Sequence, residues 1–316
     1  MSLQKRILAA CAIGAAAAIL CYTYQLGHGA SAGDLWIPLC MARALLGGAE
    51  PYAACRSVHS DGVTPATANP LTTGLAMLPF APLPDPVVAA VVFGLSSGLL
   101  AFGLARDGAW RLLVFLAFPY WESLRWVQWA PLLMAVALFP ALLPLTLIKP
   151  HVGLPIALTR LTWRRALACA AFGLLSLAIE PSWPWRWLGQ VGDYTGFVPL
   201  LALPGPLLLL ALLRWRSPDA RLFTLLALAP QRIYYDQLLL FLLPRGAREL
   251  LALSAISWLV FFGGELWPGA GRLLVVALLY GAALVLLLRR RPGGQGLRMN
   301  HRGTEDTEGR IYSNPE

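Results

Sequence analysis

Asp34 is an acidic residue placed where it can do chemistry, shortly after the first apolar run of the chain. The segment 35–46 that follows is apolar except for Pro38 and Arg43, and Gly47 and Gly48 come next. A short helix lying on a membrane surface is therefore predicted here. A carboxylate held against an apolar face loses hydration, which raises its pKa toward the range of a general base. Asp also caps helices well, and spacing alone favours the cap.

Lys149 is a second candidate, because it lies inside an apolar stretch and lysine occurs elsewhere only at position 5. An ionisable side chain in such a stretch is costly and marks a functional position by default. Pro150 breaks the helix there, so Lys149 and His151 together are predicted to hold a phosphate group. The alternatives are a lysine whose ammonium reaches the membrane interface and a histidine with a structural role.

The third candidate site is the polar segment 230–237, PQRIYYDQ, between two short apolar runs. Arg232 is predicted to contact a phosphate, with Tyr235 and Asp236 facing a sugar. Because Arg232 and Asp236 are four residues apart, they would also pair on a helix, which is the simpler alternative. Gln128 is a weaker candidate for the same site.

The composition places these residues in a membrane protein. The chain of 316 residues is 58% hydrophobic and 13% charged, against about 25% charged in soluble domains. Such a chain needs the bilayer as its solvent. The net charge of +9 comes from arginines that lie between apolar runs. This pattern indicates cytoplasmic loops and not a surface for nucleic acid.

The apolar segments predict an all-α protein with about ten to twelve membrane crossings. After the first run they fall at 70–82, 87–104, 109–120, 131–148, 150–162, 165–180, 198–213, 221–231, 233–244, 249–264 and 271–289. Several are too short to cross alone, and prolines interrupt many of them. Helices broken at membrane depth need protein or a water-filled cavity to cover the freed backbone. A cavity enclosed by broken helices is therefore expected.

The positive charges predict the orientation in a cell (inner) membrane, with both termini in the cytoplasm. One side is assigned to Lys5 and Arg6 and to the arginine clusters over 160–165, 214–221, 245–248 and 289–291. This assignment leaves 28–69, 181–197 and 265–270 outside. The first helix is expected to be retained, although Ala30-Ser31-Ala32 resembles a cleavage site. The chain is divided into a transmembrane domain over 1–291 and a disordered cytoplasmic tail over 292–316.

The five cysteines include one pair that could be bonded. Cys40 and Cys55 share the first outer loop and would form a disulfide if that loop faces an oxidising compartment. The other three lie in apolar runs, and no Cys/His spacing indicates a zinc site. No metal and no cofactor are predicted.

The three sites together resemble the glycosyltransferase C superfamily, and most of all family 87, the polyprenol-phosphate-mannose-dependent mannosyltransferases. The resemblance covers roughly 5–290. In the first loop it rests on Asp34, Ala42-Arg-Ala-Leu-Leu-Gly47, Pro51-Tyr52 and Pro70-Leu71. Further along the chain, Val127-Gln128 stands in place of a Gly-Gln pair, and Leu147-Ile-Lys149-Pro150 is followed by Arg164-Arg165. The last matching element is Tyr235-Asp236. Gln128 and Lys149 are 21 residues apart, where the family has about two helices, so a deleted or compressed helix is expected.

The resemblance implies an inverting transfer of a hexose, most of all mannose, from a polyprenyl-phosphate carrier to a lipid or glycan acceptor outside. Asp34 would be the general base. Lys149, His151, Arg232, Tyr235, Asp236 and Gln128 would bind the donor phosphate or sugar. Glu50, Tyr52 and Arg56 would belong to the acceptor side of the first outer loop.

The sequence is also compatible with two other functions. One is a transporter or flippase for a lipid or polar solute, since broken helices also suit transporters. The other is a non-catalytic member of the same fold. The enzyme hypothesis requires Asp34 at the mouth of an outward-facing cavity that also contains Lys149 or Asp236. A helix cap far from any cavity would rule this hypothesis out.

Overall fold

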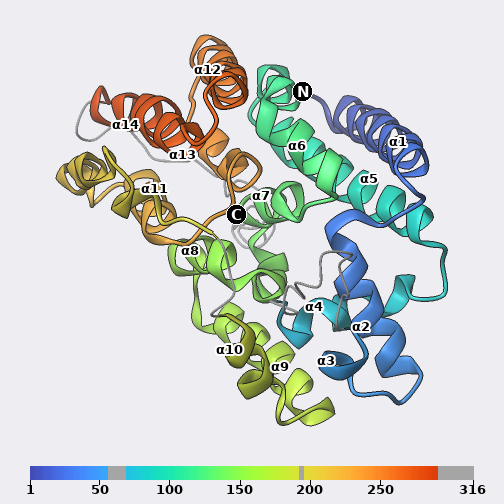
Figure 1. Cartoon of the computed structure of the whole chain (residues 1–316). Coiled ribbons are helices and arrows are strands. Elements are labelled where there is room, and N and C mark those ends of the chain that lie inside the picture. The colour runs from blue at the N-terminus through green and yellow to red at the C-terminus, as the bar shows by residue number, and fades with distance from the viewer. Residues whose placement is uncertain (56–68, 192–195, 291–316) are drawn as a thin grey trace, which may run out of the picture.

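The structure is a computed structural model that describes 1–55, 69–191 and 196–290 of the chain (Figure 1). It is all helical within these ranges, where a single bridge between Phe197 and Gln231 is the only β-type pairing. The predicted all-α class is therefore confirmed. Arg56 and the predicted tail 292–316 lie outside the described residues.

The first half of the chain has its helices in the following order: α1 Leu3–Gly27, η1 Gly33–Leu35, α2 Trp36–Leu46, α3 Pro51–Ala54, α4 Leu71–Met77, η2 Leu78–Phe80, α5 Asp85–Leu104, η3 Ala109–Leu116, α6 Phe118–Trp126, α7 Ala130–Leu138, η4 Pro140–Ile148 and α8 Pro150–Arg160. The second half continues with α9 Trp163–Ile179, α10 Trp183–Val191, η5 Pro199–Leu201, η6 Gly205–Arg214, α11 Pro218–Leu228, η7 Asp236–Leu242, α12 Ala247–Leu266, α13 Gly271–Leu274, η8 Val275–Tyr280 and α14 Gly281–Leu288.

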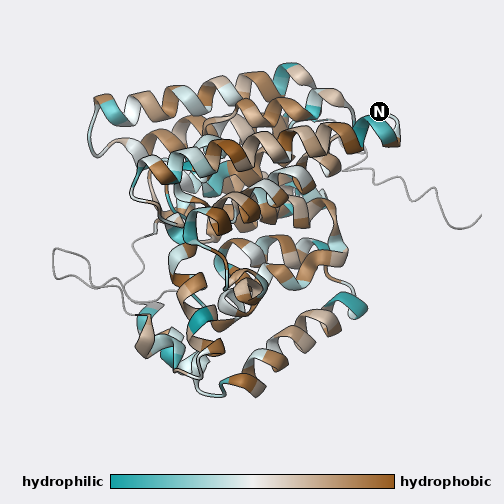
Figure 2. Cartoon of the chain, turned by 90° about the vertical axis from the view of Figure 1, so that its right-hand side faces the viewer, coloured by the Kyte–Doolittle hydropathy of each residue, from teal (hydrophilic) through white to brown (hydrophobic). Residues whose placement is uncertain are grey.

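Four helices of the described chain are long and apolar enough to cross a membrane: α1, α5, α12 and the continuous helix over 271–288. A fifth crossing is possible if α9 and α10, which meet at an angle of 97°, form one broken span. Large apolar side chains also point outward, with Leu174 64% exposed and Leu213 75% exposed. Apolar residues accordingly predominate along most helices in Figure 2. The chain is a membrane-embedded helical protein, and the count of ten to twelve crossings stays a prediction.

The packing of α1 against α5 depends on small residues. A Cβ atom built on Gly94 would lie 2.9 Å from the carbonyl oxygen of Gly14 and 2.7 Å from the Cβ of Ala18. Helices in lipid gain little from apolar burial, so close backbone approach through small residues drives their association. The two helices run side by side (Figure 1) and antiparallel, because Arg6 near the start of α1 donates to the carbonyl of Phe102 near the end of α5.

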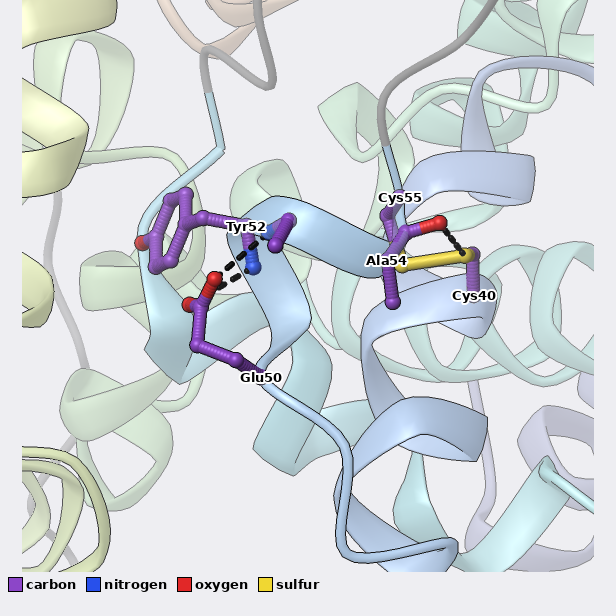
Figure 3. Close-up of a disulfide and its surroundings, with 6 residues drawn as sticks. Cys40, Glu50, Tyr52, Ala54 and Cys55 are labelled. Atoms are coloured by element: carbon purple, nitrogen blue, oxygen red, sulfur yellow. Dashed lines mark hydrogen bonds between the residues drawn. A yellow bond between two sulfur atoms is a disulfide. The ribbon is translucent and has the colours of Figure 1, made fainter.

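The predicted short helix forms as α2, and α3 follows it. Gly47 ends α2, and Glu50 begins α3 by accepting hydrogen bonds from the backbone N–H groups of Tyr52 and Ala53. Figure 3 shows these bonds beside a disulfide between Cys40 and Cys55, whose Cα atoms are 5.8 Å apart. The disulfide joins α2 to the end of α3, as its position in the sequence allowed.

The segment between Gln128 and Lys149 forms two short helices. The nine residues of α7 lead away from Gln128, and the nine residues of η4 lead back to Lys149. The lysine ammonium then donates to the side-chain oxygen of Gln128 at 3.1 Å. The fold-back of these two short helices brings Lys149 to Gln128.

Two of the arginines predicted to share one side, Arg245 and Arg290, meet near the end of α14. Asp219 forms ion pairs with Arg245 at 3.1 Å and with Arg290 at 2.5 Å. The backbone at Phe241 and Leu242 accepts hydrogen bonds from Arg111, which also faces Asp107 just after α5. The end of α14 and the start of α1 thus lie at the same end of the molecule as the end of α5.

The α1–α5 contact gives a test of the fold. We expect Gly94→Ala to destabilise the protein by about 1–3 kcal/mol, because the new methyl group meets backbone that cannot move aside. Gly173→Ala in α9 is the matched control, since its Cβ would meet nothing within 4 Å. It should be neutral or gain about 0.5–1 kcal/mol from helix propensity. Unfolding of both variants in detergent measures the difference, and equal stabilities would contradict the close packing.

Candidate functional site

A chain of four polar side chains joins the three sites that the sequence singled out. The amide nitrogen of Gln128 donates to Oδ2 of Asp34, and the amide oxygen of Gln128 accepts from Lys149 at 3.1 Å. The Lys149 ammonium lies 2.6 Å from Oδ1 of Asp236. Residues from η1, the α6–α7 junction, the η4–α8 junction and the start of η7 therefore meet at one place.

The position of Asp34 is set by a close contact of the residue before it. Gly33 has a φ of +55°. A Cβ at Gly33 would lie 2.8 Å from the carbonyl oxygen of Trp126, so only glycine allows η1 to approach the end of α6 this closely. Ser31 and Gln25 reinforce the contact: Gln25 accepts from Ser31 at 2.9 Å and donates to the carbonyl of Arg125 at 3.1 Å.

Gln128 is held by an uncommon backbone conformation at Val127. Val127 ends α6 in the left-handed region, with a φ of +52°, and it is buried. A β-branched residue is an outlier in this region, which glycine adopts freely. This is the position at which the resemblance calls for the glycine of a Gly-Gln pair. The turn redirects the chain so that the backbone N–H of Gln128 bonds to Ser123 at 2.8 Å while its side chain faces Asp34.

Lys149 lies at the break between η4 and α8, as Pro150 predicts. Such a break leaves backbone carbonyls without helical partners, and burial makes that costly. The hydroxyls of Thr72 and Thr73 in α4 satisfy two of them, at 2.7 Å from Leu147 and 2.9 Å from Ile148. The threonines thereby fasten α4 to the segment that carries the lysine.

Asp236 is fixed from two directions. Its Oδ2 accepts from the backbone N–H of Arg232 at 2.8 Å, while Oδ1 faces Lys149. The next residue, Gln237, donates to the carbonyl of Arg232 at 3.2 Å and to the side chain of Gln231 at 2.8 Å. The Lys149 ammonium also lies 4.7 Å from the centre of the Tyr235 ring, within the range of a cation–π contact.

The simpler interpretations of two residues are wrong. Neither η1 nor α2 has a side-chain cap, so Asp34 does not serve as a helix cap. Lys149 does not extend to an interface, because only 11% of its side chain is exposed and its ammonium is paired with a carboxylate that is 1% exposed. Both residues instead belong to the polar chain.

Part of the site is open to solvent. Asp34 and Arg232 are exposed, and His151 and Tyr235 are partly exposed, in front of the buried Gln128 and Asp236. Desolvation by the surrounding protein raises the pKa of the Asp34 carboxyl, against the opposing effects of Lys149, Arg232 and the hydrogen bond from Gln128. A carboxylate that is reachable, with a raised pKa, has the properties of a proton acceptor.

Glu50 and Tyr52 make structural contacts in the loop that follows α2. Glu50 caps α3 and pairs with Arg186 of α10 at 2.6 Å, which links α3 to the tryptophan-rich helix. Tyr52 is 2% exposed and its hydroxyl donates to the carbonyl of Asn69 at 3.2 Å. These contacts account for both residues without a ligand. Their predicted part on the acceptor side stays a prediction.

Sequence reasoning missed the residues that support the site. The Thr72-Thr73 pair follows directly on the Pro-Leu element, and two hydroxyls in an apolar segment were the available signal. Gln231 and Tyr280 were missed as well; they bond to each other at 2.9 Å in the core below Arg232. A single glutamine and a single tyrosine, 49 residues apart in sequence, give no pattern that predicts this contact.

The chain was compared with known protein families, curated proteins and solved structures. No family model, no curated protein and no solved structure matches the chain. Among the described residues, no group of three or more His, Cys, Asp or Glu side chains is arranged to hold a metal ion.

The buried ion pair gives a test of the geometry. We expect Lys149→Met to destabilise the protein by about 3–5 kcal/mol, because Asp236 is left buried without a counter-charge. The double variant Lys149→Met with Asp236→Leu should recover most of that loss. Thermal unfolding of the single and double variants measures the coupling. Strictly additive effects would contradict the pairing.

Proposed function

We propose that the chain is a membrane glycosyltransferase that takes a hexose from a polyprenyl-phosphate carrier. The observation that supports it is the chain of contacts from Asp34 through Gln128 and Lys149 to Asp236. These contacts bring the solvent-reachable carboxylate of Asp34 close to the buried ammonium of Lys149. The transfer needs both charges, a carboxylate to accept a proton and a cation to stabilise the leaving phosphate. We extend the proposal to a glycosyltransferase C architecture of ten to twelve crossings, with mannose as the hexose.

Asp34 acts in the proposal as the general base. It removes the proton of an acceptor hydroxyl as that oxygen forms a bond to the anomeric carbon of the sugar. The bond from this carbon to the carrier phosphate breaks on the opposite face, and the phosphate leaves with the electron pair. The configuration at the anomeric carbon is inverted. The raised pKa of Asp34 suits the role, because a base works best when its pKa approaches the working pH.

Lys149 provides the charge that stabilises the leaving phosphate. Its ammonium is paired with Asp236, which holds it in place, and it stands at the start of α8. That helix has no side-chain cap, and the positive end of its dipole lies beside the lysine. Arg232 is exposed next to this group and adds a second cation. Fixed charges in a water-poor site stabilise a developing anion strongly.

The outer location of the reaction is supported by the first loop. Asp34 precedes α2, and α2 is bonded through Cys40 to Cys55. Disulfides persist in oxidising compartments, so this loop fits the outer face of the cell membrane, with both termini in the cytoplasm. The acceptor, a lipid or a glycan, would approach Asp34 from that face.

The base assignment is tested with membranes that contain the native chain and radiolabelled polyprenyl-phosphate mannose. We expect Asp34→Asn to lower transfer by about 10²–10⁴-fold, the usual contribution of a general base. Asp107→Asn is the matched control, because its carboxylate faces Arg111 at the other end of the molecule. Equal transfer by Asp34→Asn and the native chain would overturn the assignment of the base. Absence of transfer by the native chain would overturn the proposed function.

The pH profile gives a second test. Transfer requires ionised Asp34, so the rate should fall as the pH drops through the pKa of that carboxyl. Because this pKa is raised, the fall should occur above the ordinary aspartate value of about 3.9. In Gln128→Leu, a hydrogen bond that favours the ionised form is lost, so the inflection should move to still higher pH. An unchanged profile in Gln128→Leu would contradict the proposed contact.

A further inference from the structure

The end of the molecule opposite to Asp34 carries a dense group of arginines. Over 214–221, 243–249 and 288–290 the chain holds seven arginines and two acidic residues, Asp219 and Glu249. Asp219 is occupied by Arg245 and Arg290, and Glu249 accepts from the backbone N–H of Arg245 at 2.7 Å. This leaves an excess of five positive charges.

Contacts between distant segments hold these arginines close together. Arg214, which ends η6, donates to the carbonyl of Leu288 at 3.1 Å. Arg290 pairs with Asp219 at the start of α11, and it also donates to the carbonyl of Leu243. The ends of η6, η7 and α14 and the start of α11 therefore form one junction, and α11 lies near α14 in Figure 1.

Besides Arg245, which pairs with Asp219, four arginines at this junction are exposed: Arg216, Arg221, Arg248 and Arg289. Among the described residues, no hydrogen bond or ion pair involves the guanidinium of any of them. We call these four the arginine face. An unpaired cluster of like charges is unfavourable by itself, since nearby positive charges repel one another. The arrangement is stabilised when an anion binds to it.

An exposed apolar surface adjoins the arginine face. In η6, which ends at this junction, Leu209 is 43% exposed and Leu213 is 75% exposed, and Trp215, the next residue after η6, is 47% exposed. A free phosphate or a soluble acidic protein would neutralise the arginines but leave these side chains uncovered. A phospholipid with an acidic headgroup matches both parts, with its phosphate at the arginines and its acyl chains along η6.

We propose that the arginine face binds an acidic phospholipid of the phosphatidylglycerol type. The site is separate from the Asp34 network and does not depend on the proposed enzyme activity. The bound headgroup neutralises the arginines at the junction of η6, α11 and α14. Tryptophan is favoured at the level of lipid headgroups, which suits Trp215 beside the arginines.

The test uses the purified full chain in maltoside micelles, titrated with fluorescently labelled phosphatidylglycerol or phosphatidylcholine. Each arginine near an acidic lipid contributes about 1 kcal/mol, which is about fivefold in affinity. We expect the native chain to bind phosphatidylglycerol at least tenfold more tightly than phosphatidylcholine. The variant Arg216→Gln with Arg221→Gln should weaken phosphatidylglycerol binding by about 25-fold and leave phosphatidylcholine binding unchanged.

The matched control is Lys5→Gln with Arg272→Gln, which removes the same charge from exposed residues outside the arginine face. It should bind phosphatidylglycerol as the native chain does. Equal losses in both double variants would overturn the site in favour of a general charge effect. Equal affinity of the native chain for both lipids would overturn the proposal outright, as would tighter binding of a polyglutamate peptide. Thermal unfolding of the variants verifies that each is folded.

Discussion

The ion pair between Lys149 and Asp236 is the interaction on which the arrangement of the site depends. Both side chains are largely removed from water, and the ammonium lies 2.6 Å from the carboxylate. Placing either charge alone in such surroundings costs several kcal/mol, so each requires the other. Because Lys149 begins α8 and Asp236 begins η7, the pair fixes the distance between two segments that are 87 residues apart in the chain.

The rest of the site is arranged around this pair. The amide oxygen of Gln128 accepts a hydrogen bond from the Lys149 ammonium, and its amide nitrogen donates one to the Asp34 carboxylate. The outermost carboxylate therefore remains reachable while it is coupled electrostatically to the buried cation. The supporting contacts belong to the scaffold: Gly33 allows η1 to approach α6, and Thr72 and Thr73 satisfy the carbonyls at the break before Lys149.

The two ends of the molecule differ in how they use charge. At the Asp34 end, cations and carboxylates are few and largely paired, and the Cys40–Cys55 disulfide holds the loop. At the opposite end, arginines exceed carboxylates, and several have no acidic partner among the described residues. The first arrangement suits a site in which individual charges act on a bound molecule. The second suits contact with an acidic surface, where the sum of the charges matters more than any one geometry.

The sequence by itself determined that this protein needs a bilayer around it, and it singled out the charged residues that form the polar chain. Its apolar content required a bilayer, and Asp34, Lys149 and Asp236 stood out because charge is costly among apolar neighbours. The helix over 36–46 and the break at Pro150 were also predictable, because glycine and proline act locally. The tertiary structure alone decided that the three charged residues meet, and that Asp34 is no helix cap. Such contacts depend on how α7 and η4 fold back and on the left-handed turn at Val127, and neither follows from local preference, since a valine is not expected in that conformation.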